Sequence, residues 1–470
     1  MKTKFLALAM SLGLLIASCS SDDDTITVPE TAPLTGTESI IIGGTTTFSS
    51  TTPGGTFSSA TPAVATVDAK SGVITGVSVG SSVISYNVPG SEVVTRTVTV
   101  TAIPVATGDI KGPITASITY PYGNYNLIGI VKINAGVTVT FEAGSTITSN
   151  KENGDNALVV LLGGKLITKG TADKPVVFTE KSKVPGSWGG IIMYGDAPVN
   201  VAGGKSSSTS EDGNKINYGG TNAAHNGGSL VYTRVEYAGA KLADGDKENN
   251  GFTFYSVGSG TTLDHLVSYK GADDGYEFFG GTVSMTNAIS YGNYDDAFDW
   301  QDGWQGAANT NWYAYQTGKG NYGMEIEASS NDNAYGPTVK NITLKREAGN
   351  VPEAGDNQVD AFQFKKEGNG IYSNIIIDGY GNFTNLGGTT FKGSAVSILD
   401  GATNDHQVKT GKIKLTDVKI TNTTNVLPIG ATDLIVVAFP EGNFTQSAAA
   451  TGASLTAGAW CTVDGVNLLK

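Results

Sequence analysis

Short apolar runs follow one another along most of the chain, and turns rich in glycine and asparagine separate them. Typical runs are Ile128–Ile133, Val137–Phe141, Leu158–Leu162, Phe362–Phe364 and Ile413–Leu415. No stretch keeps the 3.6-residue period of an amphipathic helix, so the pattern predicts short β-strands throughout.

The clearest internal repeat lies in the middle of the chain. Residues 263–278 align with residues 285–300 at an offset of 22 residues, and related segments occur at 249–254 and 359–364. A repeat of this length built from β-type residues predicts one coil stacked on the next, whereas a β-propeller blade needs about twice that period. We therefore expect residues 114–470 to form a right-handed parallel β-helix with about three short strands in each coil.

A smaller all-β module is predicted ahead of this β-helix, over residues 34–102. The segments Ser59–Asp68, Gly72–Val77 and Gly80–Ser85 resemble the bacterial immunoglobulin-like group 2 domain. The resemblance implies an immunoglobulin-like sandwich, which in that family is commonly a spacer or an adhesive unit. We expect a stalk here, followed by a linker over residues 103–113.

The first residues have the features of an export signal. Residues 1–18 combine an early positive charge with an apolar run that is too short to span a membrane. Ile16–Cys19 resembles a bacterial lipobox, which implies cleavage before Cys19 and attachment of lipid to that residue. An ordinary secretory signal with a chance cysteine is the alternative.

Residues 19–33 are expected to form a lipidated acidic tether. Ser20–Asp24 resembles the acidic surface-export signal of Bacteroidetes lipoproteins, although the segment could instead be a solvated tether. These features predict a protein of the outer membrane that is anchored by lipid alone and exposed at the cell surface. The second cysteine is Cys461, so a lipidated Cys19 leaves no pair for an internal disulfide.

Charge narrows the range of partners. The net charge is −13 and the pI is near 4.7, which argues against nucleic acid and against an anionic membrane surface as partners. The most plausible partners are an extracellular glycan or a surface protein.

Three motifs of the predicted β-helix carry a family resemblance. Lys132–Ile147, Gly186–Ile191 and Asp273–Gly281 resemble a Bacteroidetes surface-lipoprotein family of parallel β-helix architecture. The resemblance implies the fold but no firm activity. Some members carry the label "multidrug transporter", which this chain contradicts because it lacks the apolar stretches of transmembrane helices.

Alignment of the repeats places like residues in columns along the stack. The aromatic columns are expected to point inward and form the core. They contain Phe252, Tyr276, Phe298 and Phe362, and Phe254, Phe278, Trp300 and Phe364. A third column contains Asn250, Asp274, Asp296 and Asp360.

Acidic residues that alternate with the inward aromatic residues along each strand are expected to point outward on adjacent coils. Asp273 and Glu277 would lie about 4.8 Å from Asp295 and Asp299, where like charges repel by about 1 to 3 kcal/mol. The carboxylates could diverge into water, bind calcium together with Asp302, or include a general acid of raised pKa.

These outcomes give two sets of candidate site residues. The calcium ligands would be Asp273, Glu277, Asp295, Asp299 and Asp302. The catalytic candidates are Asp273, Glu277, Asp295, Asp296 and Asp299. Both retaining and inverting spacings are available on such a stack, so spacing alone does not select a mechanism.

Aromatic residues near these acids suggest a sugar-binding face. Trp304, Trp312, Tyr313 and Tyr294 are the ligand-binding candidates, because exposed rings stack on sugars. The alternative is that these rings cover the edge of a coil. Residues 200–228 and 329–337 are expected to frame the face as loops.

Three functional hypotheses follow. The leading one is a binding protein, not an enzyme, whose β-helix captures an extracellular glycan or a surface partner with calcium as a possible cofactor. The second is a glycoside hydrolase that uses the paired carboxylates, and the third is a passive envelope protein. A polysaccharide lyase is disfavoured because the acidic columns offer no lysine or arginine apart from Lys270.

Overall fold

The computed structural model describes residues 28–241, 249–329, 332–352 and 357–470. The chain divides into two compact units, Met1–Pro104 and Val105–Lys470. The predicted signal peptide, Cys19 and the first part of the tether lie outside the described residues. Among the helices of the described ranges, none has the length and apolar character that a membrane span requires.

The first unit is a small β-sandwich. One sheet has the order β1-β7-β6-β3 and the other β2-β5-β4, and side chains of both, such as Ile74 and Ile84, share one core. The first sheet contains β1 (Ser39–Ile41), β7 (Val94–Thr101), β6 (Gly80–Asn87) and β3 (Thr56–Ser59). The second contains β2 (Thr45–Thr47), β5 (Val73–Gly76) and β4 (Ala65–Val67). The sandwich therefore occupies the predicted module.

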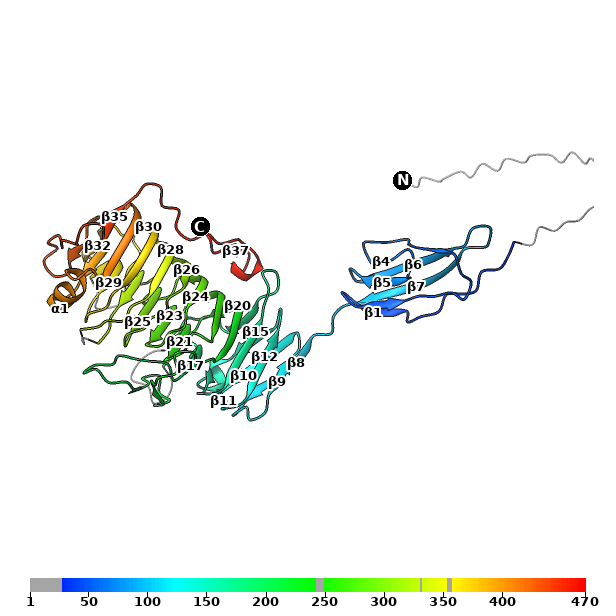
Figure 1. The fold of residues 1–470 in the computed structure, drawn as a ribbon, viewed down its shortest axis with the longest axis horizontal. Coiled ribbons are helices and arrows are strands. Elements are labelled where there is room, and N and C mark those ends of the chain that lie inside the picture. Colours follow the sequence, from blue (N-terminus) through cyan, green and yellow to red (C-terminus); the bar gives the residue numbers. More distant parts are fainter. Residues whose placement is uncertain (1–27, 242–248, 330–331, 353–356) are drawn as a thin grey trace, which may run out of the picture. The chain divides into compact units, whose positions relative to one another are not determined.

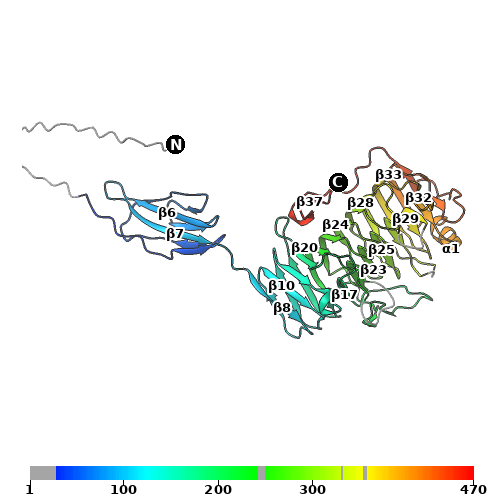
Figure 2. The ribbon, with the colours of Figure 1, turned by 180° about the vertical axis from the view of Figure 1, so that it is seen from behind.

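The second unit is a parallel β-helix, and its strands form two long stacks (Figures 1 and 2). The first sheet has 15 strands and the second has 11. The first sheet contains β8 (Ala106–Lys111), β9 (Ile118–Tyr120), β10 (Gly123–Ile128), β12 (Thr138–Glu142), β13 (Thr146–Ser149), β15 (Lys165–Lys169), β16 (Val176–Glu180), β20 (Gly228–Glu236), β22 (Thr262–Tyr269), β24 (Met285–Tyr291), β26 (Asn309–Gln316), β28 (Thr338–Arg346), β30 (Gly370–Asp378), β33 (Ile413–Thr421) and β35 (Phe444–Gln446).

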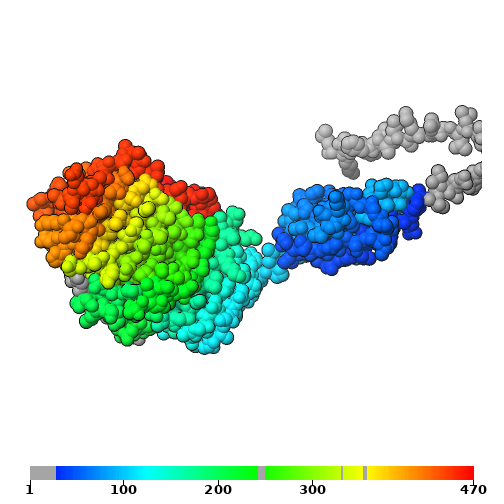
Figure 3. Space-filling model, in the orientation of Figure 1, coloured from blue at the N-terminus to red at the C-terminus, as the bar shows by residue number. Residues whose placement is uncertain are grey.

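The second sheet carries the acidic repeat. It contains β11 (Ile130–Ile133), β14 (Ala157–Val160), β17 (Ile191–Tyr194), β21 (Phe252–Tyr255), β23 (Tyr276–Phe279), β25 (Phe298–Gln301), β27 (Met324–Ile326), β29 (Gln358–Phe364), β31 (Phe383–Thr384), β32 (Thr390–Ile398) and β34 (Ile429–Gly430). In space-filling view the coils succeed one another as bands of colour from cyan to red (Figure 3). The predicted β-helix is thus confirmed as an architecture.

The predicted linker over residues 103–113 is wrong for most of its length. Residues 106–111 form β8, which pairs in parallel with β10 and belongs to the second unit. Only Ile110 of this strand is buried, because β8 ends the stack and one face meets solvent. A strand with a single buried position does not show a recognisable apolar alternation.

The predicted inward aromatic columns are confirmed. Phe252, Tyr276 and Phe298 stack on successive coils with ring centroids 5.2 and 5.3 Å apart, and all three are buried. Phe254 and Phe278 form a second ladder with centroids 5.0 Å apart. Adjacent strands lie about 4.8 Å apart, so residues at the same coil position meet ring on ring.

Two additions lie outside the coils. Between β17 and β20, residues 200–228 carry a small hairpin of β18 (Ser208–Thr209) and β19 (Asn217–Tyr218). The C-terminal segment packs Trp460 and Leu468 against Tyr269 and Tyr291 of the first sheet. The remaining short elements are η1 (Lys151–Asn153), α1 (Gly401–Thr403), η2 (Asn404–Val408), η3 (Ala459–Cys461), β36 (Thr462–Val463) and β37 (Val466–Asn467).

Candidate functional site

A cavity of about 440 Å³ lies over the second sheet, and we call it the acidic cavity. Nine carboxyl side chains and two lysines line it. The lining consists of Glu211, Asp273, Asp274, Glu277, Asp295, Asp296, Asp299, Gln301, Glu325, Glu327, Lys365 and Lys366. The cavity therefore gathers all five catalytic candidates and four of the five predicted calcium ligands.

Strand register explains why the carboxylates meet. Glu277 on β23 pairs with Asp299 on β25, and Asp299 pairs with Glu325 on β27. Three consecutive coils thus place a carboxylate at the same position, and the β-helix keeps them close despite their repulsion.

Glu277 and Asp299 point outward from the coil, as expected, but they do not diverge into water, which was one of the three outcomes considered. Each is only 7% exposed, whereas Asp273 and Asp295 are half-buried. Glu211, which the 200–228 segment supplies, and the two lysines that follow β29 line the same cavity and help to enclose it. The 200–228 segment thus frames the site as predicted.

Asp274 and Asp296 bind the backbone of the following coil. Asp274 Oδ1 accepts a hydrogen bond of 2.8 Å from the amide of Asp296, and Asp296 Oδ1 accepts one of 2.7 Å from the amide of Tyr322. This repeated contact holds successive coils together, so both aspartates have a structural role in addition to lining the cavity.

Desolvation governs the protonation of the buried acids. Burial raises the pKa of Asp299, and repulsion from Glu325 and Glu277 raises it further. Burial likewise raises the pKa values of Asp274, Glu277 and Asp296. Within the described part of the chain, no group hydrogen-bonds to Oδ1 of Asp299. This oxygen is also buried, so nothing in the described structure compensates a charge on it.

The two lysines neutralise one side of the cavity. Lys365 Nζ lies 2.6 Å from Glu325 and 3.2 Å from Glu327, and Lys366 Nζ lies 2.9 Å from Glu327. Burial disfavours the charged form of Lys365, but the field of Glu325, Glu327 and Asp299 outweighs this effect and raises the pKa of the ammonium. Lys365 is therefore a fixed positive charge and not a base.

The carboxylates form three groups whose members could share a cation. In each group one oxygen per residue lies within 4.8 Å of the others. The groups are Asp274, Glu277 and Asp299; Asp296, Asp299 and Glu325; and Asp273, Asp274 and Asp295. Several carboxylate oxygens around one point are the donor set that calcium prefers. These residues fit such an ion.

Asp302, predicted as a calcium ligand beside these acids, is not brought into their groups. It accepts hydrogen bonds of 2.5 Å from Tyr218 and 2.8 Å from Ser329. It lines an adjoining cavity of about 390 Å³, which shares Glu211 and Glu327 with the acidic cavity. Its position near the end of β25 turns it toward the 200–228 segment, away from the carboxylate groups.

Another cavity, of about 430 Å³, adjoins the acidic cavity on its other side. It shares Asp295, Asp296, Glu325 and Lys365 with the acidic cavity and also contains Asn321 and Gln363. The acidic cavity shares lining residues with both neighbours, so the three cavities adjoin one another, and together we call them the groove.

Most of the predicted sugar-stacking residues belong to the core. Trp304 is 1% and Trp312 0% exposed, and their ring nitrogens donate to Val283 and Met285 carbonyls at 3.0 and 2.9 Å. Both rings lie inside the coils, and Phe278 stacks on Trp304 with centroids 4.3 Å apart. Their assignment as ligand-binding residues is wrong because a stacking ring must present an exposed face.

Tyr313 is also buried, under the C-terminal segment, where its hydroxyl donates to the carbonyl of Lys470 at 2.8 Å. Its predicted ligand role is therefore wrong as well. Tyr294 is half-buried, and the ammonium of Lys319 lies 5.1 Å from its ring centre. Of the four aromatic candidates, it alone keeps a partly accessible ring.

One coil of the β-helix is not among those predicted from the internal repeats. Strand β27 lies between β25 and β29, so Phe298 is followed by Met324 and only then by Phe362. The column that contains Asp296 and Asp360 is therefore interrupted by the coil of β27. The repeats do not include this coil because its Met324–Ile326 strand lacks the Asp-Asp pair and the aromatic residues of the other coils. The alternation of apolar residues with Glu325 and Glu327 nevertheless indicates a strand here.

One family model matches most of the chain. Residues 112–462 match the family model described as a pectate-lyase like beta helix domain. The chain belongs to this family. One solved structure that it resembles is a family 28 exopolygalacturonase from Yersinia enterocolitica, with 10% identity over 85% of this chain and 88% of that chain and a TM-score of 0.24. No curated protein matches the sequence.

Proposed function

We propose that the protein is a glycoside hydrolase that cleaves an extracellular polysaccharide in the acidic cavity. The observation that carries the proposal is the pair of Asp299 and Glu325, neighbours on adjacent strands with carboxylate oxygens within 4.8 Å. Asp299 is buried with a raised pKa, and Glu325 is paired with Lys365. A protonated acid beside a charged carboxylate is the arrangement that glycoside hydrolysis requires.

In this mechanism Asp299 donates its proton to the glycosidic oxygen as the bond from that oxygen to the anomeric carbon breaks. Glu325 forms a bond to the anomeric carbon from the opposite side. Water then displaces Glu325 and gives its proton to Asp299, which restores both residues. Carboxyl groups about 5 Å apart favour this double displacement, with retention of configuration, over direct attack by water.

The charges in the groove favour a neutral polysaccharide. Nine carboxyl side chains face only two lysines in the acidic cavity, so a polyuronate would be repelled in the absence of cations. Elimination from a uronate also needs a base, and Lys365 is held in its charged form. These points favour hydrolysis over lyase chemistry, even though the family is named for pectate lyases.

The first test is hydrolysis of a panel of neutral and acidic polysaccharides by the mature protein, with release of reducing ends as the measurement. Asp299→Asn and Glu325→Gln should each lower kcat by about 10² to 10⁴ on the cleaved polymer. Glu142→Gln is the matched control, because Glu142 is a half-buried acid that pairs with Lys169 at 2.8 Å and does not line the cavity. Full activity of both cavity variants would overturn the proposal.

A second candidate function is calcium-supported glycan binding without cleavage. The observation that favours it is the sharing of Asp299 by two carboxylate groups, together with its unpartnered Oδ1 in the described structure. A glycan array run with calcium and with chelator tests it. Binding that requires calcium, in a protein that cleaves no polymer, would select this function. Neither binding nor cleavage would leave a passive envelope role.

The proposed location is the outer leaflet of the outer membrane, where lipid on Cys19 would hold the protein near extracellular glycans. The support is the lipobox-like sequence and the acidic residues after it. Cys19→Ala should move the protein from the membrane fraction to the soluble fraction or the medium. Unchanged fractionation of this variant would contradict lipid anchoring.

A further inference from the structure

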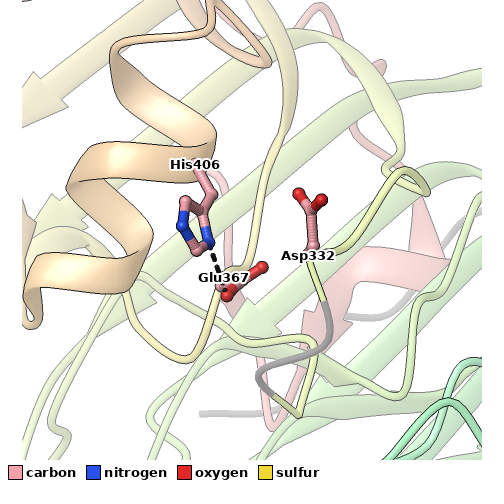
Figure 4. A group of neighbouring side chains, drawn as sticks. All are labelled: Asp332, Glu367 and His406. Atoms are coloured by element: carbon pink, nitrogen blue, oxygen red, sulfur yellow. Dashed lines mark hydrogen bonds and ion pairs between the residues drawn. The ribbon is translucent and has the colours of Figure 1, made fainter.

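Away from the carboxylate groups, three segments bring one histidine and two carboxylates together. Asp332 precedes β28, Glu367 follows β29, and His406 lies in the short helical segment formed by α1 and η2. One ligand atom of each residue lies within 4.8 Å of those of the other two. Figure 4 shows the imidazole and the two carboxyl groups gathered from these separate segments.

His406 is positioned by the helical turn that carries it. Asp400 begins this turn by accepting a hydrogen bond of 2.8 Å from the amide of Thr403, and the following residues 404–408 adopt π-helical geometry. Single π-type turns are frequent at functional sites. The turn directs His406 Nδ1 to Glu367 Oε1 at 2.9 Å and leaves the side chain 50% exposed, so an ion can approach from solvent.

Glu367 is held in place before any ligand arrives. The residue is 4% exposed, and its Oε2 accepts hydrogen bonds from the amide of Asn333 at 3.1 Å and from Gln407 Nε2 at 3.3 Å. Oε1 faces His406. Such outer contacts orient a ligating carboxylate and leave the other oxygen for the ion.

Two of the three residues have left-handed backbone conformations. Glu367 has φ +65° and Asp332 has φ +47°, values that residues other than glycine rarely adopt. Asp332 is exposed, and its present neighbour is Lys412 Nζ at 3.3 Å. This contact is a surface ion pair that a divalent cation would readily replace.

We propose that Asp332, Glu367 and His406 bind a divalent transition-metal ion such as Zn²⁺. One imidazole nitrogen and two carboxylate oxygens are a donor set of borderline softness, which suits zinc and cobalt better than calcium. Two ligands that each lie about 2.1 Å from zinc are about 3 to 3.5 Å apart, close to the distance between His406 Nδ1 and Glu367 Oε1. Water would complete the coordination.

This site is independent of the proposed hydrolysis and shares no residue with the acidic cavity. Lys366 points to Glu327 in that cavity, whereas the next residue, Glu367, faces His406. A bound ion would tie the segment that precedes β28, the loop after β29 and the helical turn to one another. The expected consequence is local stabilisation of these segments.

The test uses the full mature chain after treatment with chelator. Titration with Zn²⁺, followed by calorimetry, should show one equivalent bound, and titration with Co²⁺ should produce visible absorption bands typical of protein coordination. His406→Ala should weaken Zn²⁺ binding by at least about tenfold and remove the cobalt bands. Asp332→Asn should weaken binding with the fold intact, because Asp332 is exposed.

His265→Ala is the matched control, since His265 also contacts a carboxylate, Asp264 at 2.9 Å, but lies elsewhere on the first sheet. It should bind Zn²⁺ like the unmodified protein. Millimolar calcium should not displace the zinc. The proposal is overturned if Zn²⁺ does not bind, or if His406→Ala and Asp332→Asn bind it unchanged. A lower melting temperature of His406→Ala without any zinc effect would identify the His406–Glu367 pair as an ion pair only.

Discussion

Asp299 is the carboxyl on which both candidate functions depend. It belongs to two of the carboxylate groups, as Asp274 does, and one of its oxygens has no hydrogen-bond partner in the described structure. The charge of such a buried carboxylate can be removed by protonation or neutralised by a bound cation. Protonation suits a general acid, and a cation suits a binding site, so the state of this single residue separates the two functions.

Substitution of Asp299 should stabilise the protein in the absence of calcium. Since burial and like charges raise its pKa, the folded state bears a cost at pH 8 that Asp299→Asn removes. A raised pKa in the folded state means that ionisation at pH 8 opposes folding, so the free energy of unfolding should rise when this acid is removed. Urea denaturation in the presence of chelator measures it.

Asp264→Asn is the control, and we expect it to change the free energy of unfolding in the opposite direction. Burial opposes the charge of Asp264, but hydrogen bonds from His265, Thr286 and Asn287 outweigh burial and lower its pKa to about 2. Loss of that charge should destabilise the protein at pH 8. Equal effects of the two substitutions would contradict this account of the cavity.

Protonation of the buried acids should also make the metal-free protein more stable in mild acid. Asp274, Glu277, Asp296 and Asp299 have raised pKa values in the folded state, and burial raises that of Asp360 to about 6. This stability is fully present below the unfolded values near 4 and is lost as pH rises through the folded values.

Denaturation midpoints measured with chelator from pH 8 to pH 5 should therefore increase, and added calcium should flatten the trend. The measurement distinguishes buried carboxylates, whose charge lowers the stability of the folded state, from solvated carboxylates, whose charge does not. A midpoint that stays constant or falls over this range would indicate that the acids are not desolvated.

At the scale of elements, the site is a product of three stacked strands. β23, β25 and β27 each contribute one carboxylate at the same position, and the aromatic ladders beneath them keep the coils in register. A shift of one residue along a strand would exchange carboxylates for aromatics on the two faces. The core therefore determines the geometry of the site.

Trp312 should behave as a core residue and not as a ligand. It is fully buried and stacks on Phe298 with ring centroids 4.6 Å apart. Trp312→Ala should reduce the free energy of unfolding by about 3 to 5 kcal/mol. Tyr294→Ala, at a half-buried ring, is the comparison and should change stability far less. A stable Trp312→Ala protein that had lost glycan binding would restore the original ligand assignment.

At the scale of the whole molecule, the two units are separate in their packing. The core of the sandwich contains residues such as Phe48 and Val98, and the core of the β-helix contains residues such as Phe141 and Trp300. These two clusters have no residue in common. The proposed enzymatic site and the proposed metal site both lie in the second unit.

A fragment of residues 105–470 should therefore fold and retain polysaccharide cleavage and zinc binding at the level of the mature chain. Its boundary must precede β8, because this strand closes the first coil against β10. A fragment that begins at residue 114 is the comparison and should be less stable, since it lacks β8. Loss of both activities in the 105–470 fragment, with folding retained, would show that the sandwich takes part in function.

The repeats at residues 249–300 and 359–364 predicted much of this structure, because a parallel β-helix places like residues at like positions in each coil. Those repeats determined the fold, the inward aromatic ladders and the meeting of Asp273, Glu277, Asp295 and Asp299. The atypical β27 coil and the lysines after β29 carried no repeat signal, so their contribution was missed.

The sequence by itself therefore determined the architecture and the concentration of acidic residues, since periodic alternation encodes which side chains share a face. Only the tertiary structure decided which of those residues are buried. Burial depends on segments distant in the chain, such as 200–228 over the acids and the C-terminal segment over Tyr313. The same reason applies to Asp332, Glu367 and His406, which no spacing in the sequence relates.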